Sequence, residues 1–294
     1  MLGLNDKSWL IEKFYEIHHA SFSSCPYEGS EKLFTYDTYF GMGHSLKLID
    51  DPSVFKVSPA GLALGSYTQK MFSNNVLNGH FLDLGTGSGV IALLLRGMGA
   101  DHIIGTDISP AAVSLSVKNE TLNFGNNKIA FVVSDLFSGL PNENQKFDFI
   151  TFNPPGWRTP SEKLLEYLMS TTEVNEIPLS AMFYGDTLLL RFLQELPTYL
   201  NKGGRAIIGL NSLVGIQDIL SRYKNEKYQD RRLKFRFLER HTFPLLLYSE
   251  SWKRISSRLM EEFSSWRDKN QAAYSVDSKG NLYWSYELVE CVLW

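Results

Sequence analysis

The chain has 294 residues, of which 44% are hydrophobic and 21% are charged, and its formal net charge is -3. These values are typical of a folded globular protein with one sizeable core, and they exclude disorder on a large scale. The two cysteines are too few for a disulfide framework or a zinc module, and no signal-like segment begins the chain, so a cytoplasmic protein is expected. No apolar run reaches the roughly 18 residues of a membrane span, so no membrane association is expected.

Residues 1–57 are predicted to form a small accessory module, with a helix over 7–19 followed by short strands. Ser58 and Pro59 are a helix cap and a first-turn proline, and they predict the start of the next helix. We expect residues 58–294 to form a catalytic domain of the α/β class.

The run HFLDLGTGSGV, which starts at His80, predicts a buried strand, a glycine-rich turn and a helix capped by Ser88. The glycines that let the backbone turn and approach a ligand are Gly85, Gly87 and Gly89. A dinucleotide-binding loop has its third glycine one residue later, and a carboxylate such as Asp83 would repel a pyrophosphate. The turn therefore favours a ligand with a cationic end, and S-adenosylmethionine has an ammonium group and a sulfonium.

Two further strands are predicted to end in acids at the same edge of the sheet. The strand His102–Asp107 places Asp107 18 positions beyond the last of these glycines, about where an acid holds ribose hydroxyls in nucleotide-binding folds. The strand Lys128–Val133 is followed by Asp135, which suits either the adenine amino group or a cap for the turn. Ligands of open α/β sheets lie outside the carboxyl ends of the strands, so these acids are expected beside one ligand.

The apolar strand Phe147–Phe152 runs directly into Asn153, Pro154 and Pro155. An amide or exocyclic amino nitrogen is a poor nucleophile because its lone pair is delocalised. The Asn153 side-chain oxygen and the Pro154 carbonyl can accept the two hydrogens of such an NH2 group, and the prolines fix the loop in advance. The loop therefore presents two preset acceptors that fit the two hydrogens of one planar NH2 group.

The set LDLGTGSG, TDISP, SDLF and FNPP, in this order and spacing, resembles the class I S-adenosylmethionine-dependent methyltransferases. Within them it is most similar in pattern to the release-factor glutamine N-methyltransferases, over residues 34–210. The resemblance implies a Rossmann-like, seven-stranded sheet and methyl transfer to a planar amide or amino nitrogen of a protein. The cofactor-binding residues that it implies are Asp83, Gly85, Thr86, Gly87, Gly89, Asp107, Ile108, Asp135, Leu136 and Asn153.

Two positions depart from that family. The family usually has an aromatic residue directly after the prolines, stacked on the planar group, whereas this chain has Gly156 there and Trp157 one place later. We predict that Trp157 binds the substrate in its place, or that the pocket is wider and serves a different acceptor. Acids usually follow the family's earlier proline, but Ala60 follows Pro59 here. A glutamine of a release factor is therefore not implied as the acceptor.

Residues 157–185 are predicted to be a substrate-side insertion. Arg158 within it could contact the substrate, but we interpret it in the first place as a solvent-facing charge. The later elements are expected as a helix from 186, a strand over 205–210, a helix to 223, a strand over 232–240, a helix over 249–268 and a hairpin over 273–294. The second arm of the hairpin is predicted to be the last antiparallel strand of the sheet, and residues 241–248 compete for that place.

Other readings of the chain stay open. Residues 222–240 carry eight basic and three acidic side chains, which we interpret as a solvated strand face and, less favourably, as a groove for RNA. In one alternative, an enzyme of the same fold methylates a base of a nucleic acid or a small metabolite. A degenerate domain that binds the cofactor without turnover is a further alternative. No spacing of His, Cys or Asp residues predicts a metal site.

Overall fold

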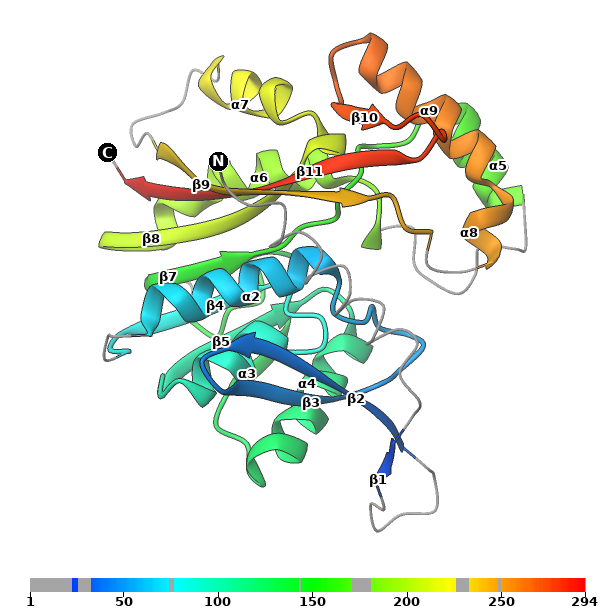
Figure 1. The fold of residues 1–294 in the computed structure, drawn as a ribbon. Coiled ribbons are helices and arrows are strands. Elements are labelled where there is room, and N and C mark those ends of the chain that lie inside the picture. Colours follow the sequence, from blue (N-terminus) through cyan, green and yellow to red (C-terminus); the bar gives the residue numbers. More distant parts are fainter. Residues whose placement is uncertain are drawn as a thin grey trace. The chain divides into compact units, whose positions relative to one another are not determined.

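The computed structural model describes residues 23–25, 33–73, 77–142, 144–170, 181–225, 233–247 and 250–293 (Figure 1). The helix expected over 7–19 lies outside these residues. The chain divides into two compact units, each described here by itself. The first unit holds the described residues up to Asn153 together with Thr198–Ile208 and Cys291–Leu293, and the second holds those of Pro154–Pro197 and Gly209–Glu290.

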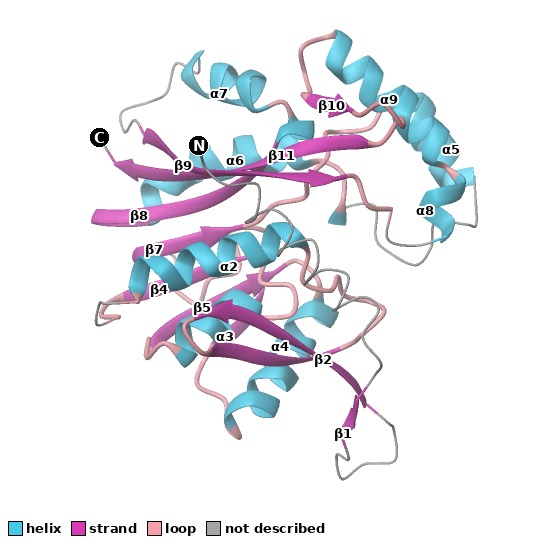
Figure 2. Ribbon diagram, viewed as in Figure 1, coloured by secondary structure: helices cyan, strands magenta, loops and turns pink. Residues whose placement is uncertain are grey.

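A parallel sheet forms the centre of the first unit (Figure 2). Its strands are β4 (His80–Leu84), β5 (His102–Asp107), β6 (Ala130–Val133), β7 (Phe147–Phe152) and the start of β8 (Leu200–Asn211). They lie in the order β8-β7-β4-β5-β6, and every neighbouring pair is parallel. The chain moves outward from β4 to β6 and then returns to the other side of β4. This reversal is the point in an open α/β sheet at which ligands bind.

Three helices of the first unit are α2 (Pro59–Phe72), α3 (Val90–Gly97) and α4 (Pro110–Phe124). The predicted caps of α2 and α4 are confirmed, because the hydroxyls of Ser58 and Ser109 accept hydrogen bonds from backbone N–H groups three residues on. The predicted Ser88 cap of α3 is wrong. Gly89 is the N-cap, with φ +83° and no side-chain hydrogen bond, because only glycine adopts this left-handed conformation cheaply.

The N-terminal strands also belong to the first unit. They are β1 (Ser23–Cys25), β2 (Leu33–Gly41) and β3 (His44–Ile49), and they form an antiparallel sheet. The Phe40 ring packs so closely on α2 that a Cβ on Gly65 would lie 2.3 Å from it. The backbone N–H of Ile49 donates to Asn119 Oδ1 of α4 at 2.8 Å. These strands therefore pack on helices of the parallel sheet, beside α3 and α4 in Figure 1.

The second unit begins at Pro154, within the Asn-Pro-Pro motif. Its elements are α5 (Glu162–Ser170), most of α6 (Gly185–Tyr199), the 3-10 helix η3 (Ser212–Val214), α7 (Ile216–Asn225), β9 (Leu233–Pro244), α8 (Glu250–Arg254), α9 (Ser256–Asp268), β10 (Tyr274–Val276) and most of β11 (Leu282–Leu293). Two short helices, with Ile255 between them, replace the single helix expected over 249–268. The hairpin of β10 and β11 is confirmed.

The α/β class is confirmed, but the sheet has eight strands among the described residues instead of the expected seven. Strands β8 and β11 have residues in both units and pair with each other. The two candidates for the last strand do not exclude one another, because the 12-residue strand β11 pairs with β9 as well as with β8 and β10.

Candidate active site

The glycine-rich turn lies at the carboxyl end of β4. Gly85, Gly87 and Gly89 all have positive φ values, of +63°, +56° and +83°. A Cβ built on Gly87 meets no atom within 4 Å, so the backbone is open at this point. The Gly87 N–H donates to Asp107 Oδ2 at 2.9 Å, which joins the turn to the end of β5. The turn therefore offers an uncovered stretch of backbone beside a carboxylate.

Asp107 is held in a fixed orientation at this edge. Its Oδ1 accepts from the Ser109 N–H at 2.9 Å, and its Oδ2 accepts from Gly87. Burial raises the pKa of Asp107, although these backbone hydrogen bonds oppose the effect. Each carboxylate oxygen can accept a second hydrogen bond. Beside it Ile108 is 65% exposed, so this edge presents hydrogen-bond acceptors for a diol and an apolar surface for a base.

Asp83 is part of the interior of the first unit. Its Oδ2 accepts from the Thr86 hydroxyl at 2.7 Å and from the Ala92 N–H at 3.3 Å, and its Oδ1 accepts from the Thr151 hydroxyl at 2.8 Å. Only 3% of the residue is exposed, and burial raises its pKa to about 6. Through these hydrogen bonds, Asp83 supports the glycine-rich turn from inside the protein. Thr86 is also buried, and its N–H donates to the Thr106 carbonyl at 2.8 Å.

The turn after β6 contains a strained residue. Leu136 has φ +50°, an uncommon value for a residue with a bulky side chain, and it is 6% exposed. The Ser134 hydroxyl donates to the Leu136 carbonyl at 2.7 Å and accepts from the Gly139 N–H at 2.8 Å. Asp135, between them, is half-buried. Its backbone carbonyl accepts from the Ser138 hydroxyl, and both predicted roles of its side chain, the cap and the adenine contact, stay predictions.

The Asn-Pro-Pro motif follows β7 directly, and the unit boundary falls after Asn153, which is half-buried. In the second unit, Pro154 and Pro155 are also half-buried. A Cβ on Gly185 would lie 2.1 Å from the Pro155 carbonyl oxygen, so only glycine fits there. The Trp157 N–H and carbonyl each form a 2.8 Å backbone hydrogen bond, to the Met182 carbonyl and from the Gly185 N–H. The loop is therefore fixed against this segment.

Trp157 lies in the interior of the second unit. It is 3% exposed, and its ring makes edge contacts with Phe183, Trp252 and Phe263 at centroid distances of 5.1 to 5.3 Å. Edge-to-face contacts of this kind stabilise an aromatic cluster. These contacts describe a packing role that holds the loop, and the predicted contact of Trp157 with substrate stays a prediction.

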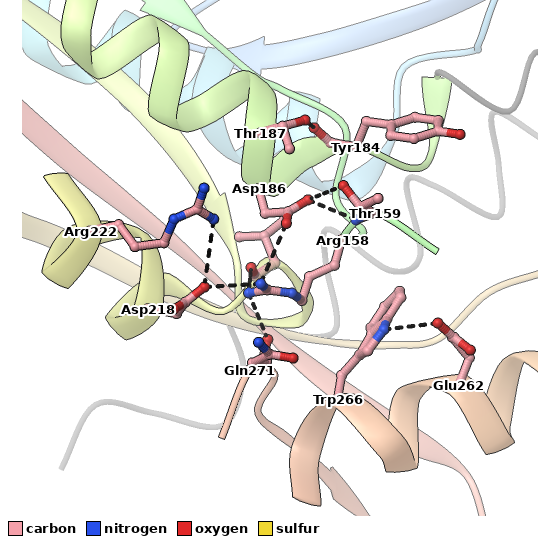
Figure 3. A network of polar contacts seen from close by, with 11 residues as sticks. Arg158, Thr159, Tyr184, Asp186, Thr187, Asp218, Arg222, Glu262, Trp266 and Gln271 are labelled. Carbon is pink, nitrogen blue, oxygen red and sulfur yellow. Dashed lines mark hydrogen bonds and ion pairs between the residues drawn. The ribbon is translucent and has the colours of Figure 1, made fainter. Parts of the chain in front are cut away.

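The interpretation of Arg158 as a solvent-facing charge is wrong. Arg158 is 7% exposed, and Figure 3 shows its guanidinium among polar partners from distant segments. Its Nη1 donates to the Val214 carbonyl at 2.9 Å, and its Nη2 lies 2.9 Å from Asp218 Oδ2 and 3.4 Å from Asp186 Oδ2. A charged residue in a loop is usually at the surface, and nothing nearby in the sequence marks these partners.

The residues after Arg158 are anchored as well. Asp186 Oδ1 accepts from the Thr159 N–H at 2.7 Å and from its hydroxyl at 2.9 Å. Glu262 accepts in the same way from the N–H and hydroxyl of Ser161, both at 2.7 Å. Two buried carboxylates therefore hold the chain that leaves the Asn-Pro-Pro motif. The described residues contain no cluster of His, Cys, Asp and Glu side chains that could hold a metal ion.

The parallel sheet with its reversal beside β4, the glycine-rich turn, the acid after β5 and the Asn-Pro-Pro motif after β7 define a class I, Rossmann-like methyltransferase. The Methyltransferase domain family matches residues 76–278, which is more than half of the chain, and the chain belongs to this family. It is an S-adenosylmethionine-dependent methyltransferase. No described helix is both long and apolar enough to cross a membrane.

The chain is similar to two curated relatives and to one solved structure. A Methanocaldococcus jannaschii protein named as a protein N5-glutamine methyltransferase is 38% identical over 151 residues, which are 51% of this chain and 71% of that protein. A release factor glutamine methyltransferase of Rhodopirellula baltica is 29% identical over 166 residues, and the match spans about half of each chain, 52% and 51%.

The solved structure is named as a methyltransferase complexed with SAH. It superposes with a TM-score of 0.52 at 12% identity, over 91% of this chain and 58% of that chain. At this identity the superposition shows the fold alone.

Proposed function

We propose that this enzyme transfers a methyl group to a planar amide nitrogen of a protein, with a glutamine side chain as the first candidate. The observation that carries the proposal is the Asn153-Pro154-Pro155 motif, placed directly after the buried parallel strand β7. The names of the two relatives support a glutamine acceptor. Because the chain spans only about half of the second relative, the acceptor is proposed for this chain on its own residues.

The residues at the sheet edge fit an adenosyl cofactor. Asp107 keeps lone pairs for two ribose hydroxyls, while Gly87 and Ser109 fix its carboxylate. Ile108 and the turn at Asp135 are proposed to contact the adenine base. Bound S-adenosylmethionine supplies an electrophilic methyl group on a sulfonium. The role proposed for Asp83 is to support the turn, since its carboxylate is already hydrogen-bonded inside the protein.

On the acceptor side, Asn153 and Pro154 do the positioning. The Asn153 side-chain oxygen and the Pro154 carbonyl each accept one hydrogen of the NH2 group, which sets its nitrogen in line with the methyl carbon. The bond from nitrogen to the methyl carbon would form as the bond from sulfur to that carbon breaks, and the nitrogen would release one proton to solvent water. Pro155 restricts the loop, so little ordering is needed when the acceptor binds.

The described part of the basic strand does not favour a nucleic acid. Arg236 of β9 lies 2.8 Å from Glu290 of β11, and Arg240 lies 2.9 Å from Glu287. Arginines that are paired with carboxylates attract phosphates less than free ones. A base or a small metabolite is therefore an outcome of the test below and not a second proposal.

The assignment of residues 1–57 as an accessory module and of 157–185 as a substrate-side insertion belongs to this proposal, as does a cytoplasmic location. Residues 157–185 closely follow the Asn-Pro-Pro motif in the sequence, and acceptor selection is expected in both segments.

The test uses methyl-labelled S-adenosylmethionine and a lysate that is separated into protein, nucleic-acid and small-molecule fractions. The wild-type enzyme is expected to label the protein fraction, and the Asn153→Ala variant is expected to label nothing. Acid hydrolysis of labelled protein releases methylamine from an N-methylated amide, whereas a methylated lysine or arginine side chain does not release it by this cleavage. Label confined to another fraction would overturn the proposed acceptor.

A further inference from the structure

Gly156, the residue after the Asn-Pro-Pro motif, packs against the side chain of Asn211. A Cβ built on Gly156 would lie 2.5 Å from Asn211 Nδ2 and 3.3 Å from Asn211 Cγ. The space beside the loop that a larger residue at 156 would fill is thus taken by a side-chain amide. Asn211 is the last residue of β8 and is 9% exposed. Both residues belong to the second unit.

The orientation of this amide follows from its hydrogen bond. Asn211 Oδ1 accepts from the Leu213 N–H at 2.9 Å, so the NH2 group is the end that faces Gly156. Within the described part of the chain, this NH2 group donates to no protein acceptor. This nitrogen is not one of the fully buried unpaired atoms in the described part of the chain, so water or a ligand can reach it. The amide therefore presents an available donor beside the loop.

A carboxamide matches this arrangement. Its NH2 group needs acceptors, which Asn153 and Pro154 supply in the proposed function, and its carbonyl oxygen, on the same carbon, needs a donor. Gly156 follows these residues in sequence, and the backbone hydrogen bonds of Trp157 fix the loop that contains it. Resting on that proposed function, we infer that Asn211 Nδ2 donates to the carbonyl oxygen of a carboxamide acceptor and selects this class of substrate.

The hydrogen bond would also assist the reaction. The nitrogen releases its proton as it gains the methyl group, so the amide stays neutral, and the hydrogen bond acts by orienting the carboxamide for in-line transfer. Removing a donor that a polar substrate group requires leaves that group unpaired and costs about 10- to 100-fold. Asn211 is thus a specificity-determining residue that contacts the substrate, and its loss affects the acceptor and not the cofactor.

Asn211→Asp is the sharpest test because the two side chains have nearly the same shape. The aspartate keeps the acceptor for the Leu213 N–H but replaces the donor by a charged acceptor. Asn142→Asp is the matched control, since Asn142 Oδ1 accepts in the same way from the N–H two residues on, Asn144, at 3.0 Å, and Asn142 is exposed. Asn211→Ala removes the donor without adding charge. Calorimetric binding of S-adenosylmethionine shows that each variant is folded.

The assay measures label that is released as methylamine from the lysate protein fraction, over a dilution series of that fraction. We expect kcat/KM to fall about 100-fold for Asn211→Asp and about 10-fold or more for Asn211→Ala, with cofactor affinity within twofold of wild type. Asn142→Asp should match wild type. Methylamine production by Asn211→Asp at the wild-type rate would overturn the inference and leave the proposed function intact. Absence of methylamine with the wild-type enzyme would overturn the carboxamide acceptor itself, and the inference with it.

Discussion

Different kinds of interaction hold two parts of the molecule. One is the edge of the parallel sheet at Asp83 and Asp107, in the first unit, which we call the cofactor edge. The other is the loop from Pro154 to Arg158, in the second unit, which we call the acceptor loop. At the cofactor edge, Asp107 is fixed by backbone N–H groups, and Asp83 is fixed by two hydroxyls and one N–H. At the end of the acceptor loop, Arg158 is fixed by carboxylates from distant segments. A carboxylate held by N–H groups keeps lone pairs for a ligand, whereas a buried ion pair satisfies its own members and fixes the backbone beside them. The first arrangement suits binding, and the second suits positioning.

The largest effect on activity is expected at Asn153, the residue directly before the start of the second unit. Asn153→Ala removes an acceptor for the NH2 group and should lower kcat by about 1,000-fold, since the interaction is proposed to act on the reacting nitrogen. Cofactor affinity should stay within a fewfold of wild type. Single-turnover methylation and calorimetry measure the two quantities separately, and normal turnover would remove Asn153 from the proposed mechanism.

Arg158→Ala tests how much the buried ion pairs stabilise the protein. Its removal leaves Asp186 and Asp218 without their buried partner, and breaking such a pair costs about 3 kcal/mol or more in the free energy of unfolding. Arg222→Ala is the matched control, because Arg222 lies 3.9 Å from the same Asp218 but its side chain is 43% exposed. Exposed pairs contribute about 0 to 1 kcal/mol. Urea unfolding of both variants should separate them, and equal losses of stability would contradict the role given to Arg158.

Asp107→Ala tests whether this carboxylate binds the ribose hydroxyls of the cofactor. Loss of the carboxylate removes the acceptors for the ribose hydroxyls, and we expect affinity for S-adenosylmethionine to fall about 30- to 100-fold, which corresponds to roughly 2 to 3 kcal/mol. Asp101→Ala, just before the other end of β5, should bind as wild type because Asp101 is exposed and far along the strand from this edge. Titration calorimetry measures both affinities. Unchanged binding by Asp107→Ala would defeat the ribose assignment.

The same comparison explains what the sequence could predict. The strands β4, β5 and β7 and the caps at Ser58 and Ser109 depend on residues that are neighbours in sequence, and all of these were predictable. The partners of Arg158 lie far away, with Val214 56 and Asp218 60 positions along the chain. No local pattern marks such contacts, so the burial of Arg158, like the role inferred for Asn211, required the fold.

The dependence of stability on pH tests whether the Asp83 carboxylate is internal. Its folded pKa of about 6 lies above the value of about 3.9 in an unfolded chain, so between these values the folded protein binds more protons. Stability should therefore fall as the pH rises from about 4 to 6, by about 2 to 3 kcal/mol from this group, and then level off.

Asp83→Asn should remove this part of the pH dependence, because the amide does not titrate. Its oxygen can keep the hydrogen bonds from the Thr86 hydroxyl and the Ala92 N–H, and its NH2 group can donate to the Thr151 hydroxyl oxygen. Burial also raises the pKa of Asp107, but that contribution is common to both proteins and cancels in the difference between their stability curves. The measurement is urea unfolding of wild type and variant at several pH values between 4 and 7. Parallel curves would show that Asp83 does not titrate in this range, and its carboxylate would then be better solvated than its contacts imply.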